Sequence, residues 1–273
     1  MPVPSAGVAR AALHGRPLLF LSAHLDDAVL SCGALIEALA HRCPVTVATV
    51  FTEAGAPPHT RAARSFLRAC GVADASSLYA DRQDEDRAVL DALGVRHVHL
   101  GVVDALFRPR DLSSRALRRA GRWVPELVHR YPTYRFDIAK GRVSRGDLGL
   151  IAQLTARVCD LLAETGAEVT FAPLGVGRHV DHLITRALAV ESDESDESDD
   201  AVVFYSDFPY DMSAPVDQGF VEGHRLEAWT WDEAIGNKAR LIRGYRTQAA
   251  ALFADGHIPR RPETYYERAI ASA

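Results

Sequence analysis

The chain has 273 residues, of which 48% are hydrophobic and 25% charged, and its formal net charge is −5. These values are typical of a globular protein with one large or two small α/β domains, and the acidic balance disfavours a nucleic-acid partner. Residues 1–16 contain no apolar stretch long enough for a signal peptide or a membrane span, and the scattered cysteines resemble free thiols of a reducing compartment. We therefore expect a cytoplasmic protein without a transmembrane segment.

The first predicted element is the apolar run Leu18–Leu21, which is typical of a buried parallel strand. Apolar residues at helical spacing over 28–41 predict a helix directly after it. The turn between the two elements holds His24, Asp26 and Asp27. Because open α/β sheets bind ligands at the carboxyl ends of their strands, this turn is a candidate site.

The residue types in this turn suit a metal ion. His24 and Asp27 are three residues apart and can face one point above the sheet edge, where imidazole and carboxylate together bind a zinc-like divalent ion. Asp26 can then stay off the metal and handle a proton. The alternative is that the aspartates cap the helix, which explains one of them but not both together with a histidine. Cys32 is a possible soft ligand, but its place in an apolar helix favours core packing.

The following elements alternate between strand and helix. This order predicts an α/β, Rossmann-like fold with a mostly parallel sheet, helices on both faces and active-site loops at the carboxyl edge of the strands. The predicted elements are a strand at 45–51, a helix at 60–71, a weak strand at 77–79, a helix at 84–93 and a strand at 96–100.

The periodicity lapses over residues 102–145, a segment rich in arginine and aromatic residues. We expect a helix near 113–129. Long non-repetitive segments in compact domains are often lids, so one interpretation is an insertion that covers the substrate. A solvated helical hairpin is an equally good interpretation of the same composition.

A second motif, His179, Asp181 and His182, follows a predicted helix at 146–165, a strand at 168–172 and a glycine-rich loop. His179 and His182 share a face of the next helix, since residues three apart are neighbours. Glycines in the loop let the backbone approach a ligand closely. Two such clusters, both at predicted strand ends, indicate one shared site.

The remainder of the chain continues the same domain, and no linker divides residues 1–273. The run 191–200 repeats Glu, Ser and Asp and is typical of a flexible, solvated acidic loop. The elements expected after it are a strand at 201–205, an irregular loop through 223, a β-segment at 225–231 and a final helix at 232–254.

The two motifs resemble those of the PIG-L/LmbE-like zinc deacetylases, which usually read Ala-His-Pro-Asp-Asp-Glu and His-Pro-Asp-His. The resemblance extends to Lys238 and to residues 245–248, which are similar to the family's late lysine and Tyr-x-Ser-Gln segment. Leu25 and Val180 stand where the family usually has proline, and Ala28 where it has glutamate. None of the three is a metal ligand in the family, so these departures concern loop geometry and the residues around the ligands.

The resemblance also implies roles for individual residues. His24, Asp27 and His182 are expected to hold one Zn²⁺ per chain with positions left open for water and substrate, and other divalent ions are possible. The catalytic residues expected are Asp26 as general base, His179 as proton donor or oxyanion stabiliser, and Asp181 as the group that orients His179.

Two further residues, Arg82 and Asp104, resemble family residues that contact the sugar. Arg82 has an alternative, because it can instead pair with Glu85 or Asp86 on the helix surface.

The implied reaction is hydrolysis of an N-acetyl group on the glucosamine of a small-molecule glycoside. The chain resembles the deacetylases of glycopeptide antibiotic pseudoaglycones of the teicoplanin and A40926 type, and an insertion rich in arginine and aromatics suits such a bulky acceptor. Deacetylation of a smaller thiol- or lipid-linked glycoside and a non-catalytic, metal-organised glycan-binding module remain alternatives. Phosphoester hydrolysis is disfavoured, because it usually needs two metals about 4 Å apart and therefore more carboxylates.

Overall fold

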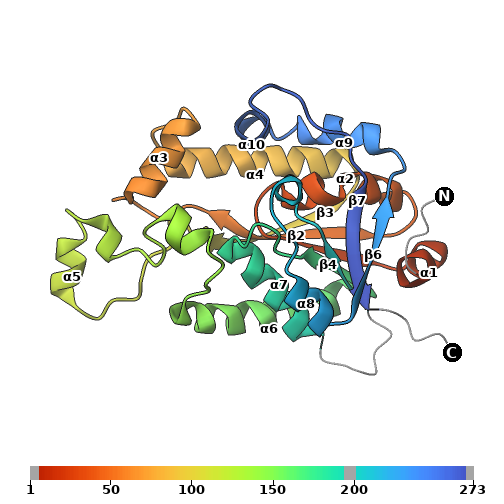
Figure 1. Ribbon diagram of the computed structural model, residues 1–273, viewed down its shortest axis with the longest axis horizontal. Helices are drawn as coiled ribbons and strands as arrows, with labels where there is room; N and C mark the ends of the chain where they lie inside the picture. Colours follow the sequence, from red (N-terminus) through yellow and green to blue (C-terminus); the bar gives the residue numbers. More distant parts are fainter. Residues whose placement is uncertain (1–5, 194–200, 269–273) are drawn as a thin grey trace.

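The computed structural model describes residues 6–193 and 201–268. Within these ranges one seven-stranded sheet forms the centre of the molecule, in the order β3-β2-β1-β4-β5-β7-β6 (Figure 1). Strands β1 to β5 run parallel, while β7 is antiparallel to β5 and β6 is antiparallel to β7. The strands are β1 (Leu18–Ser22), β2 (Val45–Glu53), β3 (Arg96–Val103), β4 (Val169–Pro173), β5 (Ala201–Tyr205), β6 (Leu226–Trp231) and β7 (Glu263–Arg268).

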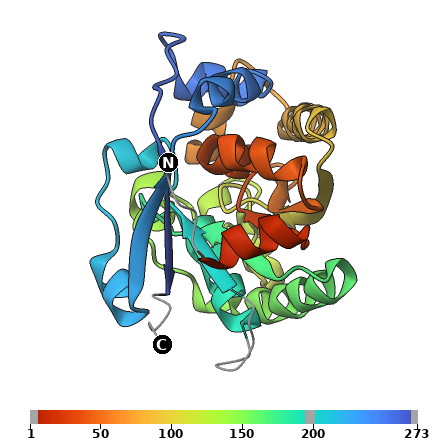
Figure 2. The same ribbon diagram turned by 90° about the vertical axis from the view of Figure 1, so that its right-hand side faces the viewer.

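Helices cover both faces of the sheet, which confirms the expected Rossmann-like, mostly parallel α/β fold (Figures 1 and 2). One face packs against α1 (Ala6–His14), α2 (Asp27–Ala40), α4 (Ala75–Ala92) and α9 (Ile235–Ile242). The other packs against α6 (Leu148–Thr165), α7 (Val180–Ser192) and α8 (Gln218–Gly223). The remaining α-helices of the described residues are α3 (Arg61–Ala69), α5 (Arg115–Ala120) and α10 (Arg246–Leu252). No helix in the described ranges is long and apolar enough to cross a membrane.

Strand β1 lies between β2 and β4 and has a fully buried side chain at every position. Because side chains alternate along a strand, Leu18 and Phe20 join one core while Leu19 and Leu21 join the other. The ring of Phe20 stacks on that of Phe171 in β4 at a centroid distance of 4.1 Å. This pairing sets the carboxyl ends of β1 and β4 side by side, where the two sequence motifs begin.

Some sequence predictions are wrong in detail. Residues 77–79 are not a strand, because they lie in α4, whose start is capped by the Asp74 carboxylate at 2.7 Å from the Ser77 amide. The helix predicted over 232–254 is divided into α9 and α10. The chain turns between them at Gly244, where a Cβ would lie 2.3 Å from Val89 Cγ2 of α4. The irregular loop expected through residue 223 contains α8.

The segment 102–145 contains α5 and a short 3₁₀ turn, Pro125–Leu127, in place of the long helix expected near 113–129. Pro125, at the start of this turn, has no amide hydrogen and therefore cannot continue a helix from the residues before it. The base of the segment is buried through Phe107, Tyr131 and Ile138, in a cluster that also contains Leu25 and Val180. The two positions that depart from the family's usual proline therefore pack in the same core as this segment.

Two smaller expectations concern side chains away from the sheet edge. Cys32 is fully buried in the core beneath α2, in agreement with the packing interpretation. The acidic run begins inside α7, which ends at Ser192, and its residues 194–200 lie outside the described residues. Its predicted flexibility therefore stays a prediction.

Candidate active site

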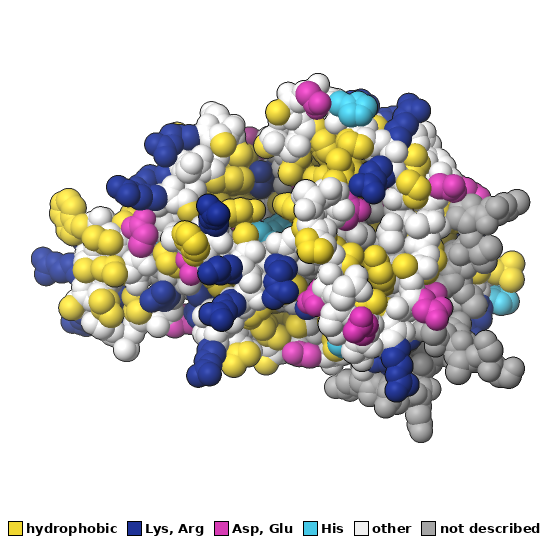
Figure 3. All heavy atoms as spheres, in the orientation of Figure 1, with side chains coloured by type: hydrophobic (Ala, Val, Ile, Leu, Met, Phe, Trp, Pro, Cys, Tyr) yellow, Lys and Arg dark blue, Asp and Glu magenta, His cyan; other side chains and the backbone are white. Residues whose placement is uncertain are grey.

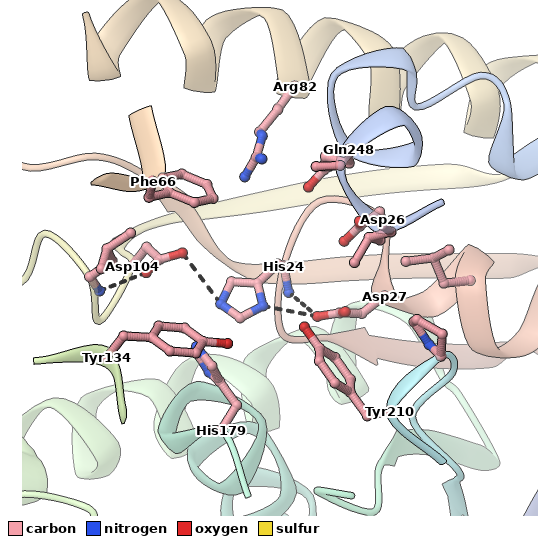
Figure 4. A pocket seen from close by; sticks show the side chains of 15 residues that line it. His24, Asp26, Asp27, Phe66, Arg82, Asp104, Tyr134, His179, Tyr210 and Gln248 are labelled. Atoms are coloured by element: carbon pink, nitrogen blue, oxygen red, sulfur yellow. Dashed lines mark hydrogen bonds and ion pairs between the residues drawn. The ribbon is translucent and has the colours of Figure 1, made fainter. Parts of the chain in front are cut away.

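The two sequence motifs meet at the sheet edge, around one carboxylate oxygen. Asp27 Oδ2 lies 3.0 Å from His24 Nδ1 and accepts the backbone amide of His24 at 2.8 Å (Figure 4). The same oxygen lies 3.2 Å from His182 Nε2. His24 and Asp27 come from the turn after β1, whereas His182 comes from the first turn of α7. All three predicted ligands thus converge from segments far apart in the chain.

The donors fit a divalent ion. Ligands held tetrahedrally at zinc-like bond lengths are separated by about 3.3 Å, close to the two distances around Asp27 Oδ2. One ring nitrogen from each of His24, His179 and His182 also lies within 4.8 Å of the other two. A second set, His24 with Asp104 and Asp181, meets the same distance limit. Only the Asp27 side of His24 brings a second imidazole, that of His182, to a shared carboxylate oxygen, so this side is the better metal site.

His182 is oriented by Asp207, a residue that the sequence analysis did not select. The Nδ1 atom of His182 lies 2.6 Å from Asp207 Oδ1, and Asp207 Oδ2 accepts the amides of Gly175 and Val176 at 2.8 and 2.7 Å. Burial opposes the charged form of His182, but Asp27 and Asp207 raise its pKa to about 10. A carboxylate behind a ligating imidazole fixes its tautomer, so Nε2 faces Asp27. Only the place of Asp207 after a strand, at the same sheet edge, could have suggested it.

Asp26 does not act as a helix cap, because its side chain makes no capping hydrogen bond at the start of α2. The carboxyl group is buried and lines the pocket beside Asp27. Burial and the neighbouring Asp27 charge raise its pKa to about 7, against the opposing charges of Arg82 and His24. A carboxylate with this pKa that is not engaged in capping the helix is suited to accept a proton near neutral pH.

His179 and Asp181 are adjacent, but their contact differs from the one expected. The backbone amide of Asp181 donates to His179 Nδ1 at 3.3 Å, whereas the Asp181 carboxylate contacts Arg108, Ala105 and His24. Burial and the His24 charge lower the pKa of His179 well below its ordinary value. A neutral ring that accepts at Nδ1 carries its hydrogen on Nε2, so His179 can donate a hydrogen bond from that atom.

A pocket of about 150 Å³ opens above these groups and contains Arg82 at its rim (Figure 4). The buried guanidinium of Arg82 lies over the Phe66 ring at 5.2 Å, and its Nε has no hydrogen-bond partner. The pairing considered for Arg82 does not occur, since Glu85 binds Thr247 while Asp86 binds His99 and Tyr245. Arg82 is therefore a buried cation that faces the pocket.

Asp104 also lines the pocket (Figure 4), with Oδ2 2.6 Å from the Tyr79 hydroxyl, which donates to it, and 3.4 Å from His24 Nε2. The pocket lining also includes aromatic and amide side chains that the sequence analysis did not select as site residues. They are Phe66, Tyr134, Tyr210 and Gln248. The aromatic content of segment 102–145 and the resemblance at residues 245–248 were the available signals for Tyr134 and Gln248.

Comparison with known proteins matches residues 19–192 to the family described as PIG-L: GlcNAc-PI de-N-acetylase. The chain belongs to the PIG-L family. It is 27% identical over 197 residues to 2'-N-acetylparomamine deacetylase of Streptomyces fradiae, a match that covers 72% of this chain and 58% of that relative. The chain thus spans less than two thirds of the curated relative it matches.

Solved PIG-L-type structures share the whole architecture. A deacetylase of the teicoplanin biosynthesis pathway, described as a bog complex, has a TM-score of 0.71 and 25% identity over 94% of this chain and 100% of its own. A complex of a deacetylase with teicoplanin has a TM-score of 0.70 and 25% identity, and the match covers 92% of this chain and 97% of that chain. The A40926 pseudoaglycone deacetylase gives 0.64 at 24% identity, covering 95% and 98%, and supports the fold alone.

Proposed function

We propose that this PIG-L protein is a divalent-metal-dependent amide hydrolase that removes the N-acetyl group from a glucosamine moiety of a glycoside. The observation that carries the proposal is the position of Asp27 Oδ2 between His24 and His182, with the unbonded Asp26 carboxyl beside them at the floor of a pocket. Zn²⁺ is the proposed ion, held by these two histidines and Asp27. The ligand set leaves positions open, as a catalytic site requires.

The residues around the ion have different proposed roles in amide hydrolysis. When bound, a divalent ion supplies electrophilic polarisation of the acetyl carbonyl and makes water more acidic. Asp26 accepts the proton from the attacking water, since its carboxyl lines the pocket beside the ligands. The Nε2 hydrogen of His179 stabilises the oxyanion, a role that its neutral tautomer suits better than proton donation. The amide of Asp181 holds the His179 ring in that tautomer.

Arg82 and Asp104, which both line the pocket, are proposed to hold the sugar. The buried Arg82 guanidinium has no carboxylate ion-pair partner in the described part of the chain, and its Nε is not hydrogen-bonded there. This guanidinium and the Asp104 carboxylate, with one oxygen near His24, are complementary to sugar hydroxyls. Burying such a cation unpaired costs free energy, so a role in substrate binding explains Arg82 better than a structural role does.

A groove beyond the pocket supports a bulky acceptor. It has a volume of about 710 Å³ and shares Tyr134 with the site pocket. Trp123 and Phe136 are 88% and 61% exposed at its wall. Figure 3 shows Lys and Arg side chains gathered at the end of the molecule that contains α5, and around the hollow in which a histidine is visible. We name it the acceptor groove; its lining residues are Arg61, Ala62, Arg64, Trp123, Val124, Pro125, Glu126, Pro132, Thr133, Tyr134, Arg135 and Phe136.

The substrate proposed from these features is an N-acetylglucosaminyl glycopeptide antibiotic pseudoaglycone, whose aromatic body would occupy the acceptor groove. Segment 102–145, which supplies most of the groove, is then the substrate-covering insertion of a single domain over 1–273. The similar deacetylases of the teicoplanin pathway support this choice. The four free cysteines support the proposed cytoplasmic location.

Metal content and turnover of single variants test the reaction. Asp26→Asn should keep about one zinc per chain and lose acetate release, whereas His182→Ala should lose both. Asp74→Asn, at the exposed cap of α4, is the matched control and should keep both. Wild-type turnover in Asp26→Asn would refute the base assignment, and a zinc-loaded wild type that releases no acetate from any glycoside would leave only the binding-module alternative.

A substrate panel tests the acceptor. Mass spectrometry should detect deacetylation of glycopeptide pseudoaglycones in preference to a thiol-linked or a lipid-linked N-acetylglucosaminide. Trp123→Ala should raise KM for the pseudoaglycone about 3- to 10-fold, the value of one aromatic contact, and leave a small glycoside unaffected. Leu13→Ala, 81% exposed on α1, is the control. Preference for a small glycoside would overturn the acceptor proposal while leaving the reaction intact.

A further inference from the structure

Arg108 is a buried arginine whose guanidinium is fully bonded on three sides. It is 5% exposed, and it belongs to segment 102–145. Its Nε donates to the carbonyl of Val103 at 3.0 Å, its Nη1 to Asp147 Oδ2 at 2.9 Å and its Nη2 to Asp181 Oδ1 at 2.5 Å. The guanidinium also lies 4.6 Å from the centroid of the Phe51 ring. Its position is therefore fixed by a carbonyl, two carboxylates and an aromatic face.

The Asp181 carboxylate contacts both Arg108 and a proposed metal ligand, His24. Its second oxygen, Oδ2, accepts the amide of Ala105 at 2.8 Å and lies 3.3 Å from His24 Nε2. A carboxylate bonded to Nε2 keeps the hydrogen on that nitrogen and leaves Nδ1 to face Asp27, which is the tautomer a metal ligand at Nδ1 requires. Asp207 performs the same task for His182 from the other side.

We propose that Arg108 is a positioning residue for the metal site, which holds the Asp181 carboxylate against His24 Nε2 and thereby sets the tautomer and direction of that ligand. The inference rests on the proposed function, since it assigns His24 to a metal. Arg108 suits this task because a planar fork can bind two carboxylates at once, whereas a lysine is a single flexible point charge. Without it, Asp181 is a buried carboxylate that has lost its only guanidinium partner among the described residues, and it no longer holds one orientation.

The competing explanation is that Arg108 only stabilises the fold. Arg130 separates the two explanations, because it contacts the same Asp147 carboxylate at 3.0 Å and has a side chain only 9% exposed. Its other ion-pair partner is the exposed Asp111. Arg130 therefore shares the ion-pair network of Arg108 but has no recorded contact with Asp181 or His24.

The experiment compares Arg108→Gln, Arg108→Lys and Arg130→Gln in the full chain. Zinc affinity is measured by chelator competition, kcat and KM are measured on an N-acetylglucosaminide, and the tautomer of His24 is measured by ¹⁵N NMR of the zinc-loaded protein. Loss of such an outer partner typically costs about 10- to 100-fold in affinity or activity, so we expect losses of this size in zinc affinity and kcat for Arg108→Gln, with KM little changed. Guanidinium in the buffer should partly restore kcat.

The remaining variants make the outcome decisive. Arg130→Gln should be destabilised yet keep wild-type zinc affinity and His24 tautomer, and Arg108→Lys should show an intermediate loss of zinc affinity. Should Arg108→Gln fail to fold, Arg108→Lys and the NMR measurement carry the test. Equal zinc affinity in Arg108→Lys and wild type, with an unchanged His24 tautomer, overturns the inference. A wild type that neither binds zinc nor releases acetate refutes the proposed function and the role of Arg108 together, whereas a zinc-binding wild type with an unchanged Arg108→Lys refutes the role of Arg108 alone.

Discussion

Replacement of Asp26 by asparagine should stabilise the metal-free protein, although it is expected to abolish activity. The Asp26 carboxyl is buried next to Asp27 and makes no capping bond that asparagine would lose. Burial is the main reason that its pKa rises from 3.8 to about 7. The folded protein therefore carries an unfavourable charge at Asp26 above neutral pH, and the neutral asparagine does not.

The sign and size follow from proton linkage. Between pH 3.8 and about 7 the folded state holds more protons at Asp26 than the unfolded state, so wild-type stability falls as the pH rises through this range. Each pH unit in the range is worth about 1.4 kcal/mol, so the full effect approaches about 4 kcal/mol above pH 7. The advantage of Asp26→Asn should be below about 1 kcal/mol at pH 4 and grow by about 2 kcal/mol between pH 5 and pH 7.

Urea unfolding in the presence of a chelator, followed by circular dichroism between pH 5 and 8.5, measures this difference. Asp181→Asn is the matched control from the same site. Burial alone would raise the pKa of Asp181, but Arg108 and His24 lower it, so the Asp181 charge stabilises the folded state at neutral pH. Asp181→Asn should therefore be less stable than wild type at pH 8. If Asp26→Asn is no more stable than wild type at pH 8, the argument that Asp26 is a destabilising buried charge is refuted.

Three further changes test other parts of the structure. Asp207→Asn should weaken zinc binding about 10- to 100-fold, because it weakens the carboxylate contact that orients His182; chelator competition measures the loss, and unchanged affinity contradicts the role of Asp207. Tyr79→Phe removes the hydroxyl that donates to Asp104 and should raise KM for the acetylated sugar about 5- to 10-fold with kcat little changed, whereas a pure kcat loss would argue against sugar binding by Asp104. Phe20→Ala should lower the unfolding free energy by about 3–5 kcal/mol in urea titrations, and a loss below 1 kcal/mol would mean that the core relaxes around it.

Much of the fold could be predicted because the strands carry strong local signals. Short apolar and β-branched runs indicated β1, β2 and β4, and the alternation with helices indicated a parallel sheet. The errors fall where local sequence is ambiguous. Residues 77–79 have a strand-like apolar pair, but a cap at Asp74 and a buried helical face place them in α4. The division between α9 and α10 depends on the approach of Gly244 to Val89, a contact that no local pattern reveals.

The ligand types and their meeting at one sheet edge could also be predicted, because strand ends of a parallel sheet lie together. The orienting contacts could not. Asp207 is 25 residues from His182, and Arg108 is 73 residues from Asp181. Neither spacing corresponds to a helix turn or a strand pair, so neither leaves a periodic signal.

The sequence by itself determined which groups are available for chemistry: one imidazole and two carboxylates after one strand, and two imidazoles after another. Only the tertiary structure decided which oxygen lies between the histidines, which carboxyl is left unbonded, and which nitrogen of each ring faces the site. The reason is physical. Residue types fix the available donors and charges, but tautomer, burial and pKa depend on atoms brought into contact from distant parts of the chain.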